Sequence, residues 1–229
     1  MDKRIIPFSP PDITDLEINE VVAALKSGWI TTGPRTKELE KKIAKWVQGY
    51  DGNGSPRCVC LNSATAALEM ALRMLGIGPQ EGGSEKDEVI TCAYTYTASA
   101  SVIAHVGAKI VLVDCSKEPG SIQMDYEKLE AAITENTKTI IPVDLAGIPC
   151  DYDTIFEIVN RKKKLFKASN DIQKAIGRIA VVTDAAHAFG ASYKGKMVGS
   201  IGDFTAYSFK EHKELTTYNS FVDKGLKVA

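Results

Sequence analysis

Hydrophobic residues along the chain fall into two alternating patterns. Short continuous runs rich in Val and Ile are typical of strands buried on both faces of a sheet. Longer segments repeat their apolar residues at helical spacing. The expected strands are 58–61, 88–91, 110–114, 139–143, 179–184 and 204–208. The expected helices are 64–75, 97–106, 125–133 and 151–164.

This regular alternation of strand and helix predicts the fold class. It favours an α/β protein with three layers, αβα, built around a mostly parallel sheet. Ligands of such sheets bind outside the carboxyl ends of the strands. We therefore look for chemistry where the strands end.

The N-terminal part, residues 1–48, is predicted to be a separate helical segment. Two amphipathic helices in "LEINEVVAALKSGWITTGPRTKELEKKIAKWV" are joined by a turn from Gly28 to Pro34. The polar stretch "GYDGNGSPR" (49–57) is typical of a surface loop. We place the large domain at residues 49–229.

Composition and charge exclude several classes of partner. The 229 residues carry 28 basic and 29 acidic side chains, a net charge of -1, so no field attracts nucleic acid or an anionic membrane. No apolar run is long enough for a membrane span or a signal peptide, and we expect a cytoplasmic protein. The five cysteines lack metal-site spacing, so we expect buried thiols and no metal.

The start of the helix at 64–75 has the features of a phosphate site. Asn62 and Ser63 are good N-cap residues, Thr65 lies in the first turn, and the small Ala64 allows close approach to the backbone. Free N–H groups and the positive end of the helix dipole attract anions. Simple capping by Asn62 and Ser63 is the alternative interpretation.

Two further strands end in groups that could contact a planar ligand. Tyr94 and Tyr96 follow the Val-Ile run of one strand, where a ring could stack on a cofactor or pack in the core. Asp184 ends the strand at 179–184, with His187 three residues later in "TDAAHAFG". A carboxylate there could pair with a protonated ring nitrogen, or could cap a turn.

The last strand leads to a hydroxyl and two amines. Ser208 ends that strand, and Lys210 and Lys213 follow in "SFKEHKELTT". A lysine becomes a nucleophile toward aldehydes when desolvation or a nearby cation lowers its pKa. The alternative is that both are solvated surface lysines.

These motifs, in this order, resemble a known family. Together with "SGWITTGP" (27–34), "AYTYTASA" (93–100), "TKTIIPVDLAGIPCD" (137–151) and "YKGKMVGSIGDFTAYSF" (193–209), they are similar to the PLP-dependent nucleotide-sugar aminotransferases. These form the DegT/DnrJ/StrS group, which includes the UDP-4-amino-4-deoxy-L-arabinose aminotransferase type. The resemblance implies the large domain of the aspartate aminotransferase fold, PLP fold type I.

The resemblance also implies catalytic roles. Lys213 would carry pyridoxal 5'-phosphate (PLP) as an internal aldimine. Asp184 would keep the pyridine nitrogen protonated, and His187 would lie beside the ring near its hydroxyl. Tyr96 would stack on the ring, with Tyr94 as the second choice.

The remaining implied contacts concern the phosphate and the substrate. Ala64, Thr65 and Ser208 would bind the cofactor phosphate. Trp29 and Thr31, in the turn of the N-terminal segment, would border the sugar-nucleotide pocket. The implied protein is a homodimer.

The implied reaction is transamination of a nucleotide-linked keto-sugar, with glutamate as amino donor. It would serve amino-sugar biosynthesis for a cell-surface polysaccharide or lipopolysaccharide. In relatives that dehydrate sugars instead, histidine replaces the lysine, and His212 beside Lys213 keeps that branch open. A nicotinamide dehydrogenase is disfavoured because "GIGPQEGG" (76–83) follows a helix and not a strand.

The chain departs from the family after the lysine. The family's Gly-rich turn is missing from "KELTTYNSFVDKGLKVA", and we expect the small C-terminal domain to be absent. The alternative function is therefore a catalytically silent truncated remnant that binds a partner or a sugar nucleotide.

Overall fold

The computed structural model describes residues 13–48 and 58–209. The chain divides into two units, the first comprising residues 1–60 with 209–229 and the second residues 61–208. The predicted domain boundary after residue 48 stays a prediction, because residues 49–57 lie outside the described part.

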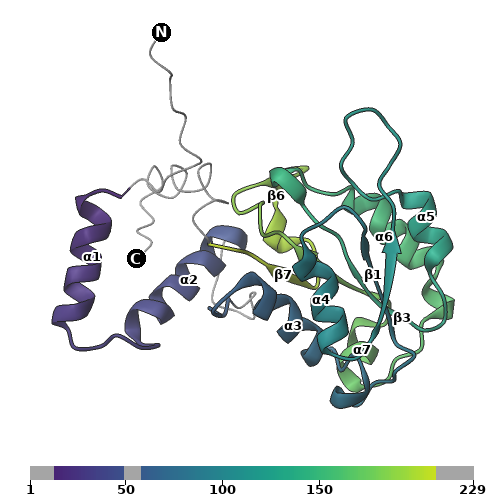
Figure 1. The fold of residues 1–229 in the computed structure, drawn as a ribbon, viewed down its shortest axis with the longest axis horizontal. Coiled ribbons are helices and arrows are strands. Elements are labelled where there is room, and N and C mark those ends of the chain that lie inside the picture. Colours follow the sequence, from purple (N-terminus) through teal and green to yellow (C-terminus); the bar gives the residue numbers. More distant parts are fainter. Residues whose placement is uncertain (1–12, 49–57, 210–229) are drawn as a thin grey trace, which may run out of the picture. The chain divides into compact units, whose positions relative to one another are not determined.

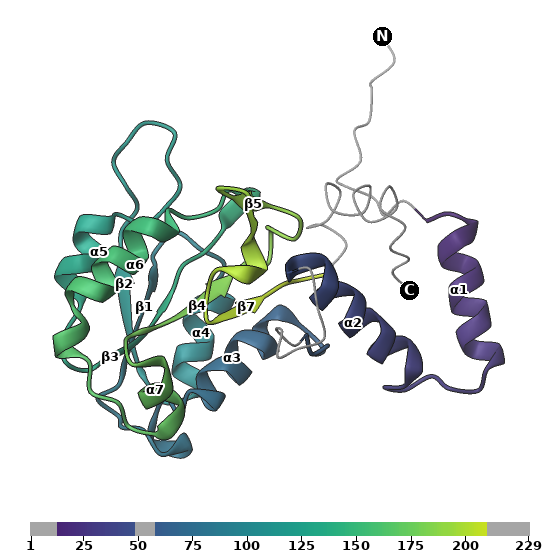
Figure 2. The same ribbon diagram turned by 180° about the vertical axis from the view of Figure 1, so that it is seen from behind.

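A five-stranded sheet forms the centre of the second unit. Its strands are β1 (Glu88–Cys92), β2 (Lys109–Val113), β3 (Thr137–Ile141), β4 (Ala180–Asp184) and β7 (Phe204–Ala206). They lie in the order β2-β1-β3-β4-β7, and every neighbouring pair is parallel. Figure 1 shows the fold, and Figure 2 labels all five strands. The predicted mostly parallel sheet is confirmed.

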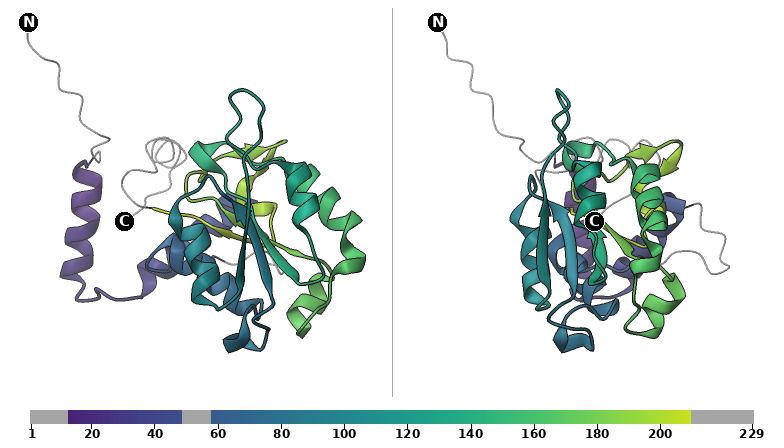
Figure 3. Two further views of the ribbon diagram at one scale, coloured as in Figure 1. Left: turned by 45° about the vertical axis from the view of Figure 1, so that its right-hand side comes forward. Right: turned by 90° about the vertical axis from the view of Figure 1, so that its right-hand side faces the viewer.

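Successive side chains of a strand point to opposite faces, and in β1, β3 and β4 both faces are buried. Ile90 and Val181 pack with α5 (Tyr126–Ala132) and α6 (Tyr152–Arg161). Their neighbours Val89 and Val182 pack with α3 (Ala64–Met74) and α4 (Thr97–His105) on the other side. Figure 3 shows the two pairs of helices on opposite faces, which confirms the αβα layers.

Shorter elements complete this unit. The sequence does not predict the hairpin of β5 (Ser192–Tyr193) and β6 (Lys196–Met197) or the short α7 (Asp171–Ile176). Each is too short to give a hydrophobic period. Four 3-10 turns lie between the larger elements: η1 (Pro79–Glu81), η2 (Leu145–Gly147), η3 (Lys163–Leu165) and η4 (Val198–Ser200).

The predicted strand at 58–61 is wrong. These residues are described, and they form neither strand nor bridge. A strand exists only where an adjacent strand accepts and donates its backbone hydrogen bonds. No described strand pairs with this segment, so its apolar composition alone does not make it part of the sheet.

The first unit contains the two predicted helices. α1 (Asp15–Lys26) begins with a capping box, in which Thr14 and Glu17 each bind the other's backbone N–H. α2 (Pro34–Gln48) buries an apolar stripe that includes Ile43 and Val47.

The direction of α3 follows from the contacts at its C-terminal end. The Leu75 carbonyl accepts hydrogen bonds from Asn170 Nδ2 at 2.8 Å and Gln173 Nε2 at 2.7 Å. Both donors belong to the α7 region, which leads into the amino end of β4. α3 packs against β4 and β7, which lie side by side in Figure 2. Because 11 helical residues span about as much as a five-residue strand, α3 begins near the carboxyl edge of the sheet.

A buried polar network lies just beyond β3. Asp144 is fully buried, and its carboxylate accepts hydrogen bonds from the Cys150 N–H at 2.8 Å and the Tyr152 hydroxyl at 2.7 Å. The Tyr152 hydroxyl also lies 3.3 Å from Thr183 Oγ1. Burial raises the pKa of Asp144 to about 6, and the nearby charge of Asp184 acts in the same direction.

An ion pair at the amino edge holds β7 against β4. The Arg178 guanidinium binds both carboxylate oxygens of Asp203, at 2.7 and 2.9 Å. Asp203 also accepts the Val181 N–H at 2.8 Å. Both side chains of the pair are about one-fifth exposed.

We expect Asp203→Ala to lower the free energy of unfolding by about 2–3 kcal/mol, because it leaves the Arg178 guanidinium without its carboxylate partner and the Val181 N–H without its acceptor. Urea unfolding measures this difference. The exposed Asp171, which pairs with Lys174 three residues later, is the control. Asp171→Ala should cost less than about 1 kcal/mol, and equal losses in the two variants would contradict the assignment.

We expect Asp144→Asn to make stability less sensitive to pH. The raised pKa means that the folded state holds this proton up to about pH 6, whereas the unfolded chain releases it near pH 4. Asp144 therefore lowers stability as pH rises through this window. The stability of the variant relative to wild type should rise by about 2–3 kcal/mol between pH 4 and 7. A stability difference between the variant and wild type that does not change with pH would contradict a raised pKa of Asp144.

Candidate active site

The carboxyl edge of the sheet brings Asp184 and Ser208 together. Asp184 is the last residue of β4 and pairs in register with Ala206, the last residue of β7. The Ala185 N–H donates to the Ala206 carbonyl at 2.9 Å. Ser208 follows two residues later and is buried. The two predicted site residues therefore lie at adjacent strand ends.

Asp184 is 5% exposed, and each oxygen of its carboxylate has a hydrogen-bond donor. Ser99 Oγ donates to Oδ2 at 2.7 Å, and the Ala186 N–H donates to Oδ1 at 3.2 Å. A buried carboxylate is costly unless hydrogen bonds replace its hydration. The short Asx turn to Ala186 shows that the turn-capping alternative holds as well, but it occupies only one oxygen.

The contact with Ser99 brings the start of α4 to this edge. Tyr96 is the N-cap residue of α4 and lies in the turn that carries Ser99. Tyr94 is 58% exposed and Tyr96 70% exposed, so core packing does not account for either ring. Both rings remain candidates for stacking.

His187 is held by the turn that follows β3. Its Nδ1 accepts the Ala146 N–H at 3.2 Å, so the neutral ring carries its proton on Nε2. Ala146 has φ +55°, a left-handed conformation that costs free energy in a residue with a side chain. The turn thus fixes which ring nitrogen of His187 donates.

The start of α3 supplies backbone donors. Ser63 is its N-cap, and Ser63 Oγ accepts the Ala66 N–H at 3.1 Å, so capping by Ser63 is confirmed. The preceding N–H groups, of Ala64 and Thr65, have no acceptor within the helix by geometry. The direction of α3 places these groups at the carboxyl edge, where an anion would meet them.

Two predicted site residues lie in the first unit. Trp29 is 57% exposed, and its Nε1 donates to the Thr32 carbonyl at 3.1 Å. A side chain at Gly33 would collide with the indole, because its Cβ would lie 2.1 Å from Trp29 Nε1. Thr31 is exposed in the same turn. Lys213, the predicted nucleophile, lies outside the described residues.

The sequence patterns do not single out Ser99, although it contacts Asp184. Ser99 is one of several small hydroxyl residues in "YTYTASAS", and its partner is 85 residues away. The only local signal is a hydroxyl in the first turn of a helix that follows an aromatic strand end. Asp144 has no sequence signal beyond its position after a predicted strand.

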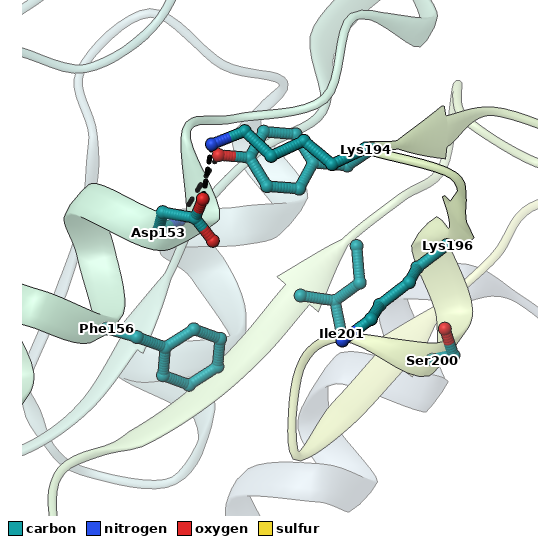
Figure 4. Close-up of a pocket in the computed structure, with 7 residues that line it drawn as sticks. Asp153, Phe156, Lys194, Lys196, Ser200 and Ile201 are labelled. Carbon is teal, nitrogen blue, oxygen red and sulfur yellow. Dashed lines mark hydrogen bonds and ion pairs between the residues drawn. The ribbon is translucent and has the colours of Figure 1, made fainter.

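A hollow of about 320 Å³ lies apart from these residues, between α6 and the β5–β6 hairpin. Figure 4 shows Asp153 and Lys194, which form an ion pair at its rim, and Phe156 and Lys196 on its walls. None of the predicted cofactor residues lines it.

Other predicted absences concern metals and membranes. Among residues 13–48 and 58–209, no group of three His, Cys, Asp or Glu side chains could hold a metal ion. The described helices include none long and apolar enough to cross a membrane. All five cysteines are free, but only Cys92 and Cys150 are buried, so the expectation of buried thiols is wrong for the other three.

Known proteins are similar to this chain in both sequence and fold. Residues 11–220 match the DegT/DnrJ/EryC1/StrS aminotransferase family. The Streptococcus pneumoniae protein Spr1654, described as a sugar aminotransferase and solved in its PLP form, is 56% identical with a TM-score of 0.82. The match covers 91% of this chain and 50% of Spr1654. Spr1654 has also been solved in a PMP form.

Two curated relatives are also similar to this chain in sequence. The spore coat polysaccharide biosynthesis protein SpsC of Bacillus subtilis is 40% identical over 93% of this chain and 48% of its own length. The UDP-4-amino-4-deoxy-L-arabinose–oxoglutarate aminotransferase of Shewanella sediminis is 37% identical over 95% of this chain and 48% of its own. The chain spans about half the length of these relatives.

The predicted fold is confirmed as the large domain of PLP fold type I, because the similar solved structures have that fold. The chain belongs to the DegT/DnrJ/EryC1/StrS aminotransferase family, whose cofactor is PLP.

Proposed function

We propose that this chain binds PLP and contributes the cofactor half of an aminotransferase site. The substrates are a nucleotide-linked keto-sugar and glutamate, and the product serves amino-sugar biosynthesis for a cell-surface polysaccharide or lipopolysaccharide. The observation that carries the proposal is the buried Asp184 carboxylate at the same sheet edge as the start of α3.

The chemistry of the donor set fits PLP, which has an anionic phosphate at one end and a basic ring nitrogen at the other. The N–H groups of Ala64 and Thr65, with the Thr65 and Ser208 hydroxyls, suit the phosphate. The Asp184 carboxylate suits a protonated ring nitrogen. When bound, PLP supplies the electron sink that stabilises negative charge on the reacting carbon.

The protein's own groups orient the ring and hold its protons. Asp184 keeps the ring nitrogen protonated, since a buried carboxylate is stabilised by a facing cation. His187 would donate its Nε2–H to the ring hydroxyl, because Nδ1 accepts the Ala146 N–H. Tyr96 stacks on the ring face, with Tyr94 as the alternative. Lys213 moves the proton between the cofactor carbon and the substrate carbon.

The names of the relatives support the substrate class. One relative is named for polysaccharide biosynthesis, and another for a UDP-sugar and oxoglutarate. In this proposal Trp29 and Thr31 border the sugar nucleotide. The protein acts in the cytoplasm as a homodimer.

We expect the purified chain to develop a visible absorption band on adding PLP, and borohydride to remove it. Lys213→Ala should abolish the band, because in this proposal Lys213 supplies the amine that bonds the cofactor aldehyde. Lys210→Ala, three residues earlier, is the matched control and should keep it. Absence of a band from well-folded wild-type protein would sink the proposal and favour a non-catalytic binding role.

We expect L-glutamate to bleach the PLP-loaded band and to release 2-oxoglutarate, at most one equivalent per site without a keto-sugar. D-Glutamate should do neither, because proton transfer by one lysine acts on one face of the donor. An enzyme-coupled assay measures the 2-oxoglutarate. Equal responses to the two enantiomers would argue against a shaped donor site.

A further inference from the structure

We infer that Ser99 is a positioning residue for the cofactor, acting through Asp184, and that Thr95 directs its proton. The inference rests on the proposed function and deepens it. Neither hydroxyl is among the residues that the family resemblance implies for the site. Their place in the structure, between the start of α4 and the end of β4, carries the inference.

The direction of the Ser99 proton follows from its three neighbours. Ser99 Oγ lies 2.7 Å from Asp184 Oδ2, 2.8 Å from Thr95 Oγ1 and 3.4 Å from the Tyr96 carbonyl. A hydroxyl has one proton, and an ionised carboxylate can only accept. The proton therefore goes to the nearest acceptor, Asp184, in a charge-assisted hydrogen bond.

Thr95 must then be the donor to Ser99. With its own proton committed to Asp184, the Ser99 oxygen can only accept from Thr95 Oγ1. The result is a directed chain from Thr95 through Ser99 to Asp184. Each bond in such a chain polarises the next, so the chain holds the carboxylate more firmly than Ser99 would alone.

This series of hydrogen bonds fixes the orientation of the Asp184 carboxylate. Ser99 binds one oxygen and the Ala186 N–H binds the other, so rotation of the carboxylate breaks at least one hydrogen bond. About two of its four acceptor positions stay available for a ring N–H. Ser99 is fully buried and 0% exposed, so water does not compete for this contact.

The same hydroxyl links two proposed cofactor contacts. The Ser99 hydroxyl lies 3.4 Å from the Tyr96 carbonyl, which also accepts the Ser99 N–H at 3.2 Å and so closes the first turn of α4. Ser99 thereby sets the turn that carries the stacking candidate against the carboxylate that faces the ring nitrogen. Loss of the Ser99 hydroxyl would let the distance between Tyr96 and the Asp184 carboxylate vary, and the fold would stay intact.

The first test measures the hydrogen bond without cofactor. In a double-mutant cycle on the free chain, Ser99→Ala and Asp184→Ala should be coupled by roughly tenfold in the unfolding equilibrium constant. Ser101 is the matched control, because it lies in the same helix and its hydroxyl donates to the Ala98 carbonyl of that helix. Ser101→Ala and Asp184→Ala should show no more than about twofold coupling. Equal coupling in the two cycles overturns the inference.

The second test measures PLP binding by absorption titration, together with the pH midpoint of the visible band. Ser99→Ala should weaken PLP binding about tenfold and move the midpoint, whereas Ser101→Ala should do neither. Ser99→Thr, which keeps the hydroxyl, should restore affinity to within about threefold of wild type. Thermal unfolding monitored in parallel confirms that each variant is folded.

Thr95→Val keeps the inference testable if Ser99→Ala fails to fold. It preserves the shape of Thr95 and removes the donor to Ser99, so it should give a smaller loss of affinity and a midpoint shift in the same direction. A wild-type band that Ser99→Ala and Thr95→Val leave unchanged overturns this inference only. A wild-type chain that forms no band overturns the proposed function, and the inference with it.

Discussion

Asp184 ends a strand that is buried on both faces, and a carboxylate in that position loses nearly all of its hydration. Hydrogen bonds from the protein must replace the lost water. The surrounding elements meet this need from two directions, since the first turn of α4 brings Ser99 and the chain after β4 brings the Ala186 N–H. These two hydrogen bonds replace only part of the hydration that the carboxylate has in water. A protonated ring nitrogen is the kind of partner that completes such a site.

The parallel sheet makes this arrangement possible because it gathers all strand ends at one edge. Asp184, Ser208 and the start of α4 each belong to a separate strand–helix unit, and the register of β4 with β7 aligns the first two. Asp144 lies at the same edge and is fully buried in its own network. The two carboxylates therefore have different environments, one bound to a tyrosine hydroxyl and the other facing the proposed cofactor.

Hydrophobic pattern was enough to predict the layers, the parallel sheet and most of its strands. It failed at 58–61, since apolar composition does not reveal whether a neighbouring strand exists. Side chains at strand ends, such as Asp184, could be predicted because the rule for parallel sheets says where ligands bind. Ser99 could not, because its role depends on a contact across 85 residues, and small hydroxyl residues are common at helix starts.

The anchoring of α3 has a consequence for how the chain acquires its fold. The Leu75 carbonyl finds its two donors 95 and 98 residues later, at Asn170 and Gln173. Strands β1 and β3 likewise pair although β2 and two helices lie between them in the sequence, so many native contacts join residues far apart in the chain. Such topologies fold slowly, because the entropy cost of closing a long loop arises before the contacts that offset it can form. During synthesis, α3 leaves the ribosome well before β4 and β7, so part of its apolar face is a target for chaperones until those strands emerge.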